Sequence, residues 1–218
     1  MSNKIHIYFM PGLGANSEIF DHLRLSDEKF ELHFLEWLIP EPLDEKLEDY
    51  VKRVIKEIKH PNPVLVGVSF GGIIVQEISK YIDTQKVIII SSIKHLNEIP
   101  RRLKFLKVTK FYKFFPAKKI ANTDDFPVIR FNRTIRKRIE LYNKYLKVRD
   151  ENYLKWSIHN VISWKCDVDN DNIIHIHGNK DEIFPIKYIK NCIVVEGGTH
   201  VMILNKAKRI SAILEDII

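Results

Sequence analysis

Six short apolar runs are spaced along the chain, and each has the length of a β-strand. Several of them are apolar throughout, without polar residues in alternation, which is typical of parallel strands that are covered on both faces. The runs are Ile5–Phe9, Leu32–Leu35, Val64–Val68, Val87–Ile90, Ile173–Ile176 and Ile193–Val195. They predict a sheet of about six, mainly parallel, strands.

Segments with helical periodicity lie between these runs. Leu43–Ile58 has an apolar stripe at intervals of three and four residues, with acidic residues near its start and lysines near its end, as expected of an amphipathic helix. Another helix is expected over Asn205–Ile217. Because strands alternate with helices, the pattern predicts an α/β fold in which helices cover both faces of a parallel sheet.

The alternation is interrupted once, between the fourth and fifth apolar runs. Residues 93–165 show no convincing strand pattern, and helical stretches are expected around 100–115, 133–147 and 151–164. A chain of 218 residues is long enough for one sizeable domain. We therefore interpret residues 1–218 as a single α/β domain, with 93–165 as a helical cap or lid inserted into it.

The third apolar run leads directly into a motif with catalytic character. Gly67-Val68-Ser69-Phe70-Gly71 reads G-x-S-x-G, and a helix-compatible stretch follows it. In this strand–turn–helix context a sharp turn lifts the serine hydroxyl to the carboxyl edge of a sheet, and glycines avoid clashes in so tight a turn. The motif predicts Ser69 as a nucleophile, whereas the alternative is that Ser69 only caps the following helix.

A base and a carboxylate for such a serine follow the last two apolar runs. Asp181 lies just beyond the fifth run and His200 just beyond the sixth. The carboxyl ends of parallel strands meet at one edge of the sheet, so Ser69, Asp181 and His200 are expected to lie together there. A serine nucleophile needs a histidine base that is held by a carboxylate. The order Ser, Asp, His is the one associated with this type of turn, and adjacent Glu182 is an alternative acid.

Other acidic residues and histidines lie close to the fifth run. Three aspartates precede it and are expected at the opposite, amino edge of the sheet; they are Asp167, Asp169 and Asp171. His175 and His177 form an H-x-H pattern on the strand, but no third metal ligand is evident nearby. We interpret them, and His6 on the first strand, as partly buried strand histidines, and we expect no metal site.

A serine nucleophile also requires donors for the oxyanion that develops during acyl transfer. Met10-Pro11-Gly12-Leu13-Gly14 follows the first apolar run and is therefore expected at the same edge as Ser69. Its glycines allow the backbone to approach a substrate, and Gly12 is predicted to contact it. The predicted donors are the backbone N–H groups of Leu13 and of Phe70, the residue after the nucleophile.

Taken together, four motifs resemble those of the α/β-hydrolase superfamily. They are Pro11-Gly12-Leu13-Gly14, Gly67-Val68-Ser69-Phe70-Gly71-Gly72, His177-Gly178-Asn179-Lys180-Asp181 with Pro185, and Gly197-Gly198-Thr199-His200. Pro11-Gly12 stands where the superfamily often has His-Gly. The resemblance implies an α/β-hydrolase fold and a small serine hydrolase, similar to esterases and lipases, that cleaves carboxylic esters through an acyl-enzyme without a cofactor.

The positive charge of the chain is concentrated in the predicted insertion. The net charge is +7, but residues 93–148 contain sixteen Lys/Arg and four Asp/Glu, so that the remainder is acidic. The basic segment 101–119 has eight cations, no acid and many aromatic residues. We interpret it as a lid helix whose apolar face covers Ser69. The alternative is docking to an anionic membrane surface or selection of an anionic substrate. Nucleic-acid binding is not expected, because no recognition motif accompanies the charge.

The apolar side chains of the insertion favour a substrate with a hydrophobic acyl group. Phe111, Phe115 and Trp156 are the predicted substrate contacts within it. The alternative for Trp156, and for Trp164, is that the indole packs the insertion onto the sheet. Thioesterase or acyltransferase activity is the nearest alternative function, because the basic residues would also suit an anionic carrier. A non-catalytic protein that binds membrane surfaces is the alternative outside enzymes, and an exposed aromatic lid would also allow two copies to pair.

The remaining features of the sequence concern its compartment. No apolar run approaches the roughly 20 residues that span a bilayer, and no secretory leader is evident. Cys166 and Cys192 match no metal-ligand spacing and are interpreted as thiols in a reducing environment. The expected location is therefore the cytoplasm.

Overall fold

The computed structural model describes residues 4–42, 44–101, 105, 144–166 and 173–218. Most of the helices expected around 100–115 and 133–147 lie outside this part of the chain. The same holds for the basic segment 101–119, apart from Arg101 and Phe105, and for Phe111 and Phe115. Asp167, Asp169 and Asp171 also lie outside the described residues.

The centre of the fold is a sheet of six parallel strands in the order β2-β1-β3-β4-β5-β6. The strands are β1 (Ile5–Met10), β2 (Phe30–Phe34), β3 (Val64–Val68), β4 (Lys86–Ile90), β5 (Ile173–Gly178) and β6 (Ile193–Val195). The register places Met10 beside Gly67 and Gly67 beside Ile89, so the carboxyl ends of these strands reach one edge together. The prediction of a parallel α/β sheet is confirmed.

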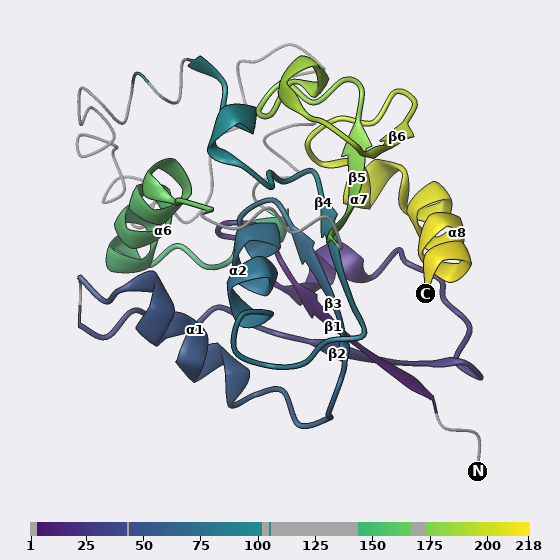
Figure 1. The fold of residues 1–218 in the computed structure, drawn as a ribbon, viewed down its shortest axis with the longest axis horizontal. Coiled ribbons are helices and arrows are strands. Elements are labelled where there is room, and N and C mark those ends of the chain that lie inside the picture. Colours follow the sequence, from purple (N-terminus) through teal and green to yellow (C-terminus); the bar gives the residue numbers. More distant parts are fainter. Residues whose placement is uncertain (1–3, 43, 102–104, 106–143, 167–172) are drawn as a thin grey trace.

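Helices cover both faces of this sheet. The α-helices are α1 (Leu47–Ile55), α2 (Phe70–Ile78), α6 (Glu151–Ser163), α7 (Met202–Asn205) and α8 (Ala207–Ile217), and the short 3-10 helices are η1 (Ser17–Phe20), η2 (Leu96–Glu98) and η4 (Ile186–Tyr188). In Figure 1, α1, α2 and α6 lie to one side of the strands, and α8 lies to the other.

The boundaries of two helices differ from the sequence prediction. The helix expected over Leu43–Ile58 is confined to α1. Among the described residues before it, the buried Glu45 carboxylate accepts hydrogen bonds from Glu41 N and Arg53, which holds this segment as a loop. The single helix expected over Asn205–Ile217 is divided into α7 and α8. Lys206 departs from helical geometry between them, with φ −122° and ψ 19°.

Alternate residues of the central strands enter two separate apolar layers. Tyr8, Leu65 and Ile89 pack with α1, α2 and α6 on one face, whereas Phe9 and Val66 pack with η1, α7 and α8 on the other. This two-sided burial explains why the strands contain so few polar residues. The burial stabilises the folded state by about 25 cal/mol for each Å² of apolar surface that is removed from water.

Helix α6, from the predicted insertion, belongs to the first of these layers. The Trp156 ring centroid lies 4.3 Å from that of Tyr50, and its indole N–H donates to the carbonyl oxygen of Glu45 (2.7 Å). After the helix, the indole N–H of Trp164 donates to the carboxylate of Glu77 on α2 (2.7 Å). The end of the predicted insertion is thus built into the core, and the extent of the lid stays a prediction.

None of the helices among the described residues combines the length and the apolar character that are required to cross a membrane.

A tight backbone contact at Gly71 predicts a severe effect for one glycine substitution. A Cβ atom at Gly71 would lie 2.3 Å from the carbonyl oxygens of both Met10 and Pro11, and backbone at the end of β1 cannot move aside without disturbing the sheet. We expect Gly71→Ala to lower the free energy of unfolding by about 3 kcal/mol or more, as measured by urea denaturation.

Gly12→Ala is the matched control for this substitution. The new Cβ atom would lie 3.5 Å from Cβ of Ser69, which is an ordinary van der Waals distance. A Gly71→Ala protein with the same denaturation midpoint as Gly12→Ala would contradict the assigned contact.

Candidate active site

Ser69 occupies a strained turn between β3 and α2. Its backbone has φ 53° and ψ −117°, a conformation that persists only where surrounding contacts impose it. Ser69 N donates to the carbonyl oxygen of Ile90 (2.9 Å). The Ser69 carbonyl oxygen accepts from Gly72 N (2.9 Å) and from the Ser92 hydroxyl (2.7 Å). Groups on two sides of the turn therefore hold the serine at the sheet edge.

The structure brings Ser69, His200 and Asp181 into one hydrogen-bonded chain. Ser69 Oγ lies 2.9 Å from His200 Nε2, and His200 Nδ1 lies 2.8 Å from Asp181 Oδ2. The Asp181 side chain is fully buried, whereas that of His200 is 23% exposed. Asp181, rather than the exposed Glu182, contacts the imidazole.

The Asp181 carboxylate is held in place by the backbone as well as by His200. Its Oδ1 accepts hydrogen bonds from Ile183 N (2.8 Å) and Phe184 N (2.9 Å). Burial by itself would raise the pKa of Asp181, but the hydrogen bond and charge of His200 and the Phe184 N–H outweigh it, so the pKa lies below its ordinary value. Asp181 is therefore ionised at neutral pH. The stability that it contributes is present above the pKa of an unfolded aspartate and is lost as the pH falls through its folded pKa.

A close crossing of two loops brings Asp181 and His200 together. A Cβ atom at Gly178, the last residue of β5, would lie 2.2 Å from the carbonyl oxygen of Gly198. That carbonyl oxygen accepts a hydrogen bond from Lys180 N (2.8 Å). The loops after β5 and β6 therefore pass each other in backbone contact, which explains why glycines stand at this point of both loops.

His175 and His177 lie in the interior behind Asp181. His177 Nε2 lies 2.8 Å from the carbonyl oxygen of Phe184, and His177 Nδ1 lies 3.0 Å from His175 Nε2. Burial lowers the pKa of His177 despite the opposing effects of Phe184 and Asp181, so the ring is neutral and donates through Nε2. Phe184 packs edge-on against His200, with ring centroids 5.5 Å apart. His177 thus supports the loop that carries Asp181, a role that the H-x-H pattern alone did not indicate.

The loop after β1 lies directly beside Ser69. Gly12 is in van der Waals range of Ser69 Cβ, and the indole N–H of Trp37 donates to the Gly12 carbonyl oxygen (3.0 Å). Trp37 also stacks on Phe70, with ring centroids 5.1 Å apart and planes 7° apart. One side chain thereby joins the two segments that contain the predicted oxyanion donors, Leu13 and Phe70.

Tyr153 of α6 holds the same loop from the other side. Gly14 has φ +74°, and its N–H donates to the Tyr153 hydroxyl (3.1 Å). Its carbonyl oxygen accepts from Val148 N (2.9 Å). Neither Tyr153 nor Trp37 was predicted from the sequence, since each is far along the chain from the glycine that it contacts and belongs to no local motif.

Trp156 and Gly12 are the predicted substrate contacts that the structure describes. Gly12 lies beside Ser69. Trp156 is 4% exposed and packs edge-on against Phe70, with ring centroids 5.9 Å apart. Trp156 therefore supports the segment behind Ser69, and its contact with a substrate stays a prediction.

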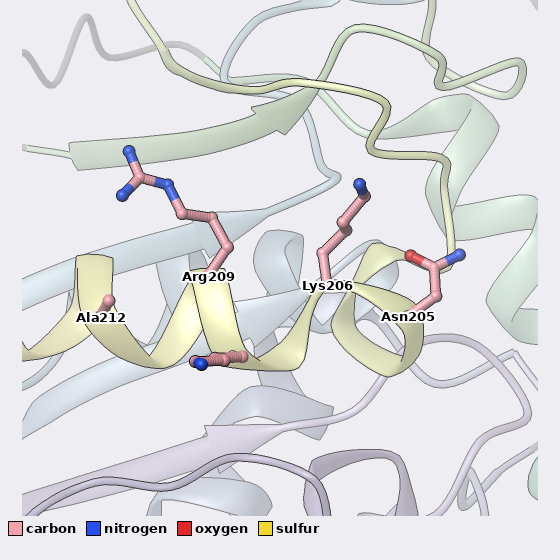
Figure 2. Close-up of a pocket in the computed structure, with 5 residues that line it drawn as sticks. Asn205, Lys206, Arg209 and Ala212 are labelled. Atoms are coloured by element: carbon pink, nitrogen blue, oxygen red, sulfur yellow. The ribbon is translucent and has the colours of Figure 1, made fainter.

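A surface hollow is present on α7 and α8. It is lined by Asn205, Lys206, Lys208, Arg209 and Ala212, and Figure 2 shows the side chains of Lys206 and Arg209 extending from the helical ribbon. The lining is cationic and includes none of the three hydrogen-bonded residues, Ser69, His200 and Asp181. We assign the hollow no part in the candidate active site.

Comparison with known proteins gives matches only at the level of structure. No family model and no curated protein matches the sequence. A lipase-esterase related protein from Clostridium acetobutylicum is 17% identical, with a TM-score of 0.63 over 100% of this chain and 96% of that one. A structure from a study of carboxylesterases of Nitrososphaera gargenis is 16% identical, with a TM-score of 0.62 over 99% of this chain and 90% of that one.

A third similar structure comes from a study of metagenomic epoxide hydrolases of the α/β-hydrolase superfamily. It is 12% identical, with a TM-score of 0.68 over 99% of this chain and 91% of that one. At such identities the likeness concerns the fold, and the parallel sheet with its strained Ser69 turn agrees with it. The chain has the α/β-hydrolase fold.

Proposed function

We propose that this protein is a serine hydrolase that cleaves carboxylic esters. The observation that carries the proposal is the continuous chain of hydrogen bonds from Ser69 Oγ through His200 to the buried Asp181. It supplies a nucleophile, a base and an orienting carboxylate in the geometry that acyl transfer requires. The structural neighbours described as carboxylesterases and a lipase-esterase related protein support the same chemistry.

Ser69 Oγ attacks the ester carbonyl carbon while His200 Nε2 accepts its proton. The protonated imidazole then gives this proton to the departing alcohol, which leaves an acyl group on Ser69. A water molecule attacks the acyl-enzyme with His200 as base again, and the carboxylic acid is released. Asp181 keeps the proton of the neutral imidazole on Nδ1 and stabilises the imidazolium.

The backbone N–H groups of Leu13 and Phe70 stabilise the oxyanion in both steps. In other enzymes, the removal of one such donor lowers kcat by about 10²–10³-fold. Trp37 sets their relative position, because it donates to Gly12 and stacks on Phe70. Trp37 is therefore a positioning residue rather than a catalytic one.

The first test is fluorophosphonate labelling, which needs no knowledge of the substrate. We expect an adduct on Ser69 in the wild type, located by peptide mass mapping, and none in Ser69→Ala or His200→Ala, because the probe reacts only with an activated serine. Turnover of matched oxyester and thioester substrates would then distinguish an esterase from a thioesterase.

Absence of an adduct in well-folded wild-type protein would contradict the proposal. Co-sedimentation with anionic vesicles that persists in Ser69→Ala would in that case favour the alternative of a non-catalytic protein that binds membrane surfaces.

Trp37→Phe tests the positioning of the oxyanion loop. Loss of the indole N–H should lower kcat by about 10- to 100-fold with little change in KM, because the two donor segments lose a common anchor while substrate contacts remain. Ester hydrolysis and thermal unfolding should be measured on the same samples.

Trp164→Phe is the matched control, since it also removes a buried indole hydrogen bond but one that is made to Glu77 on α2. We expect both variants to lose similar stability and only Trp37→Phe to lose kcat. Equal losses of kcat would show that Trp37 has no specific effect on the oxyanion loop.

A further inference from the structure

Three histidines and a glutamate gather near the amino end of the sheet. His6 lies on β1, Glu31 and His33 lie on β2, and His60 lies in the turn between α1 and β3. Each offers one ligand atom, and these four atoms all lie within 4.8 Å of one another. The parallel register pairs His6 with Glu31, which places their side chains on the same face of the sheet.

Three of these side chains already lie at separations near those around a tetrahedral ion. His6 Nδ1 lies 3.1 Å from His33 Nε2, Glu31 Oε2 lies 3.7 Å from His6 Nδ1, and Glu31 Oε1 lies 3.8 Å from His33 Nε2. Tetrahedral zinc with bonds of about 2.0–2.2 Å holds its ligand atoms about 3.3–3.6 Å apart. Side-chain rotations are required to place one Glu31 oxygen and both ring nitrogens around one ion.

His60 has the supporting contact that is typical of a metal ligand. Its Nδ1 lies 2.7 Å from the Tyr8 hydroxyl oxygen, which accepts a hydrogen bond from Lys59 N (3.0 Å). In the tautomer whose Nδ1–H donates to Tyr8, Nε2 is available for a metal, and such outer partners orient ligating histidines. The His60 ring now stacks on His6, with centroids 3.5 Å and planes 7° apart. Ligation requires it to tilt out of this stack, because a metal lies in the plane of the imidazole that binds it.

The charge of the cluster suits a cation. Glu31 supplies a negative charge that offsets part of the charge of a divalent cation.

We propose that His6, Glu31, His33 and His60 form a binding site for one divalent transition-metal ion of the zinc type. Imidazole with carboxylate is a donor set that suits zinc, copper and nickel. A bound ion would tie the edge strand β2 and the turn after α1 to β1, and so would stabilise the fold. The metal site is separate from the proposed site of ester cleavage. His6 precedes Met10 by four residues, which is about 13 Å along the strand. Met10 pairs with Gly67 of β3, and Ser69 lies beyond Gly67.

The test uses protein without a polyhistidine tag in a His200→Ala background, so that the hydrogen-bonded site at Ser69 offers no competing imidazole. Calorimetric titration with Zn²⁺ should show one equivalent bound. His33→Ala and His60→Ala each remove a ligand and should weaken the Zn²⁺ affinity about 100-fold or more. This loss is larger than the loss expected when only a hydrogen-bond partner of a ligand is removed. His159→Ala removes an exposed histidine of α6 and should change nothing.

Two further readouts keep the test independent of any one variant. Zn²⁺ should raise the unfolding temperature of the parent protein but not that of His60→Ala, because an ion that binds only the folded state stabilises it. Tyr8→Phe keeps the buried ring and should weaken Zn²⁺ binding about tenfold by removing the partner of His60.

Two results would overturn the proposal. One is the absence of saturable Zn²⁺ binding to the parent protein. The other is binding whose stoichiometry and affinity are unchanged in folded His33→Ala, His60→Ala and Tyr8→Phe. None of these measurements depends on catalysis, so the proposed esterase activity and the metal site stand or fall separately.

Discussion

The close approach of the turn after β3 to the end of β1 is the constraint on which the candidate active site depends. Gly71 lies against the carbonyl oxygens of Met10 and Pro11, and Gly12 in turn lies against Ser69. This contact fixes the distance between Ser69 and the predicted oxyanion loop. The strained backbone of Ser69 is tolerated because bonds from Ile90, Gly72 and Ser92 hold it on either side.

A buried charge is the second requirement of the site, and the loop after β5 provides for it. A carboxylate without partners would be costly to bury, but Asp181 accepts two backbone hydrogen bonds besides the one from His200. His177 holds the Phe184 carbonyl of the same loop. The acid therefore remains ionised and fixed, so the imidazole has one orientation.

The two ends of the sheet carry different chemistry. The candidate catalytic residues gather where the strands end, since the loops that leave parallel strands meet there. At the amino end, the residues on the α1 side are His6, Glu31 and His33 rather than apolar ones, and His60 covers them. A metal ion at this end would act on stability alone.

The linear pattern was sufficient to predict the fold and the residues that meet at Ser69. Apolar strands, helical stripes and short glycine motifs are local signals, and parallel strands bring whatever follows them to one edge. Nothing local predicted that Trp37 and Tyr153 would anchor the predicted oxyanion loop, or that His6, Glu31, His33 and His60 would meet. Those contacts join segments far apart in the chain, and their geometry arises only when strand order and register are set. The sequence by itself thus determined the element types and the candidate catalytic residues. The tertiary structure decided which distant side chains hold them in place, because packing and hydrogen-bond geometry are properties of neighbours in space.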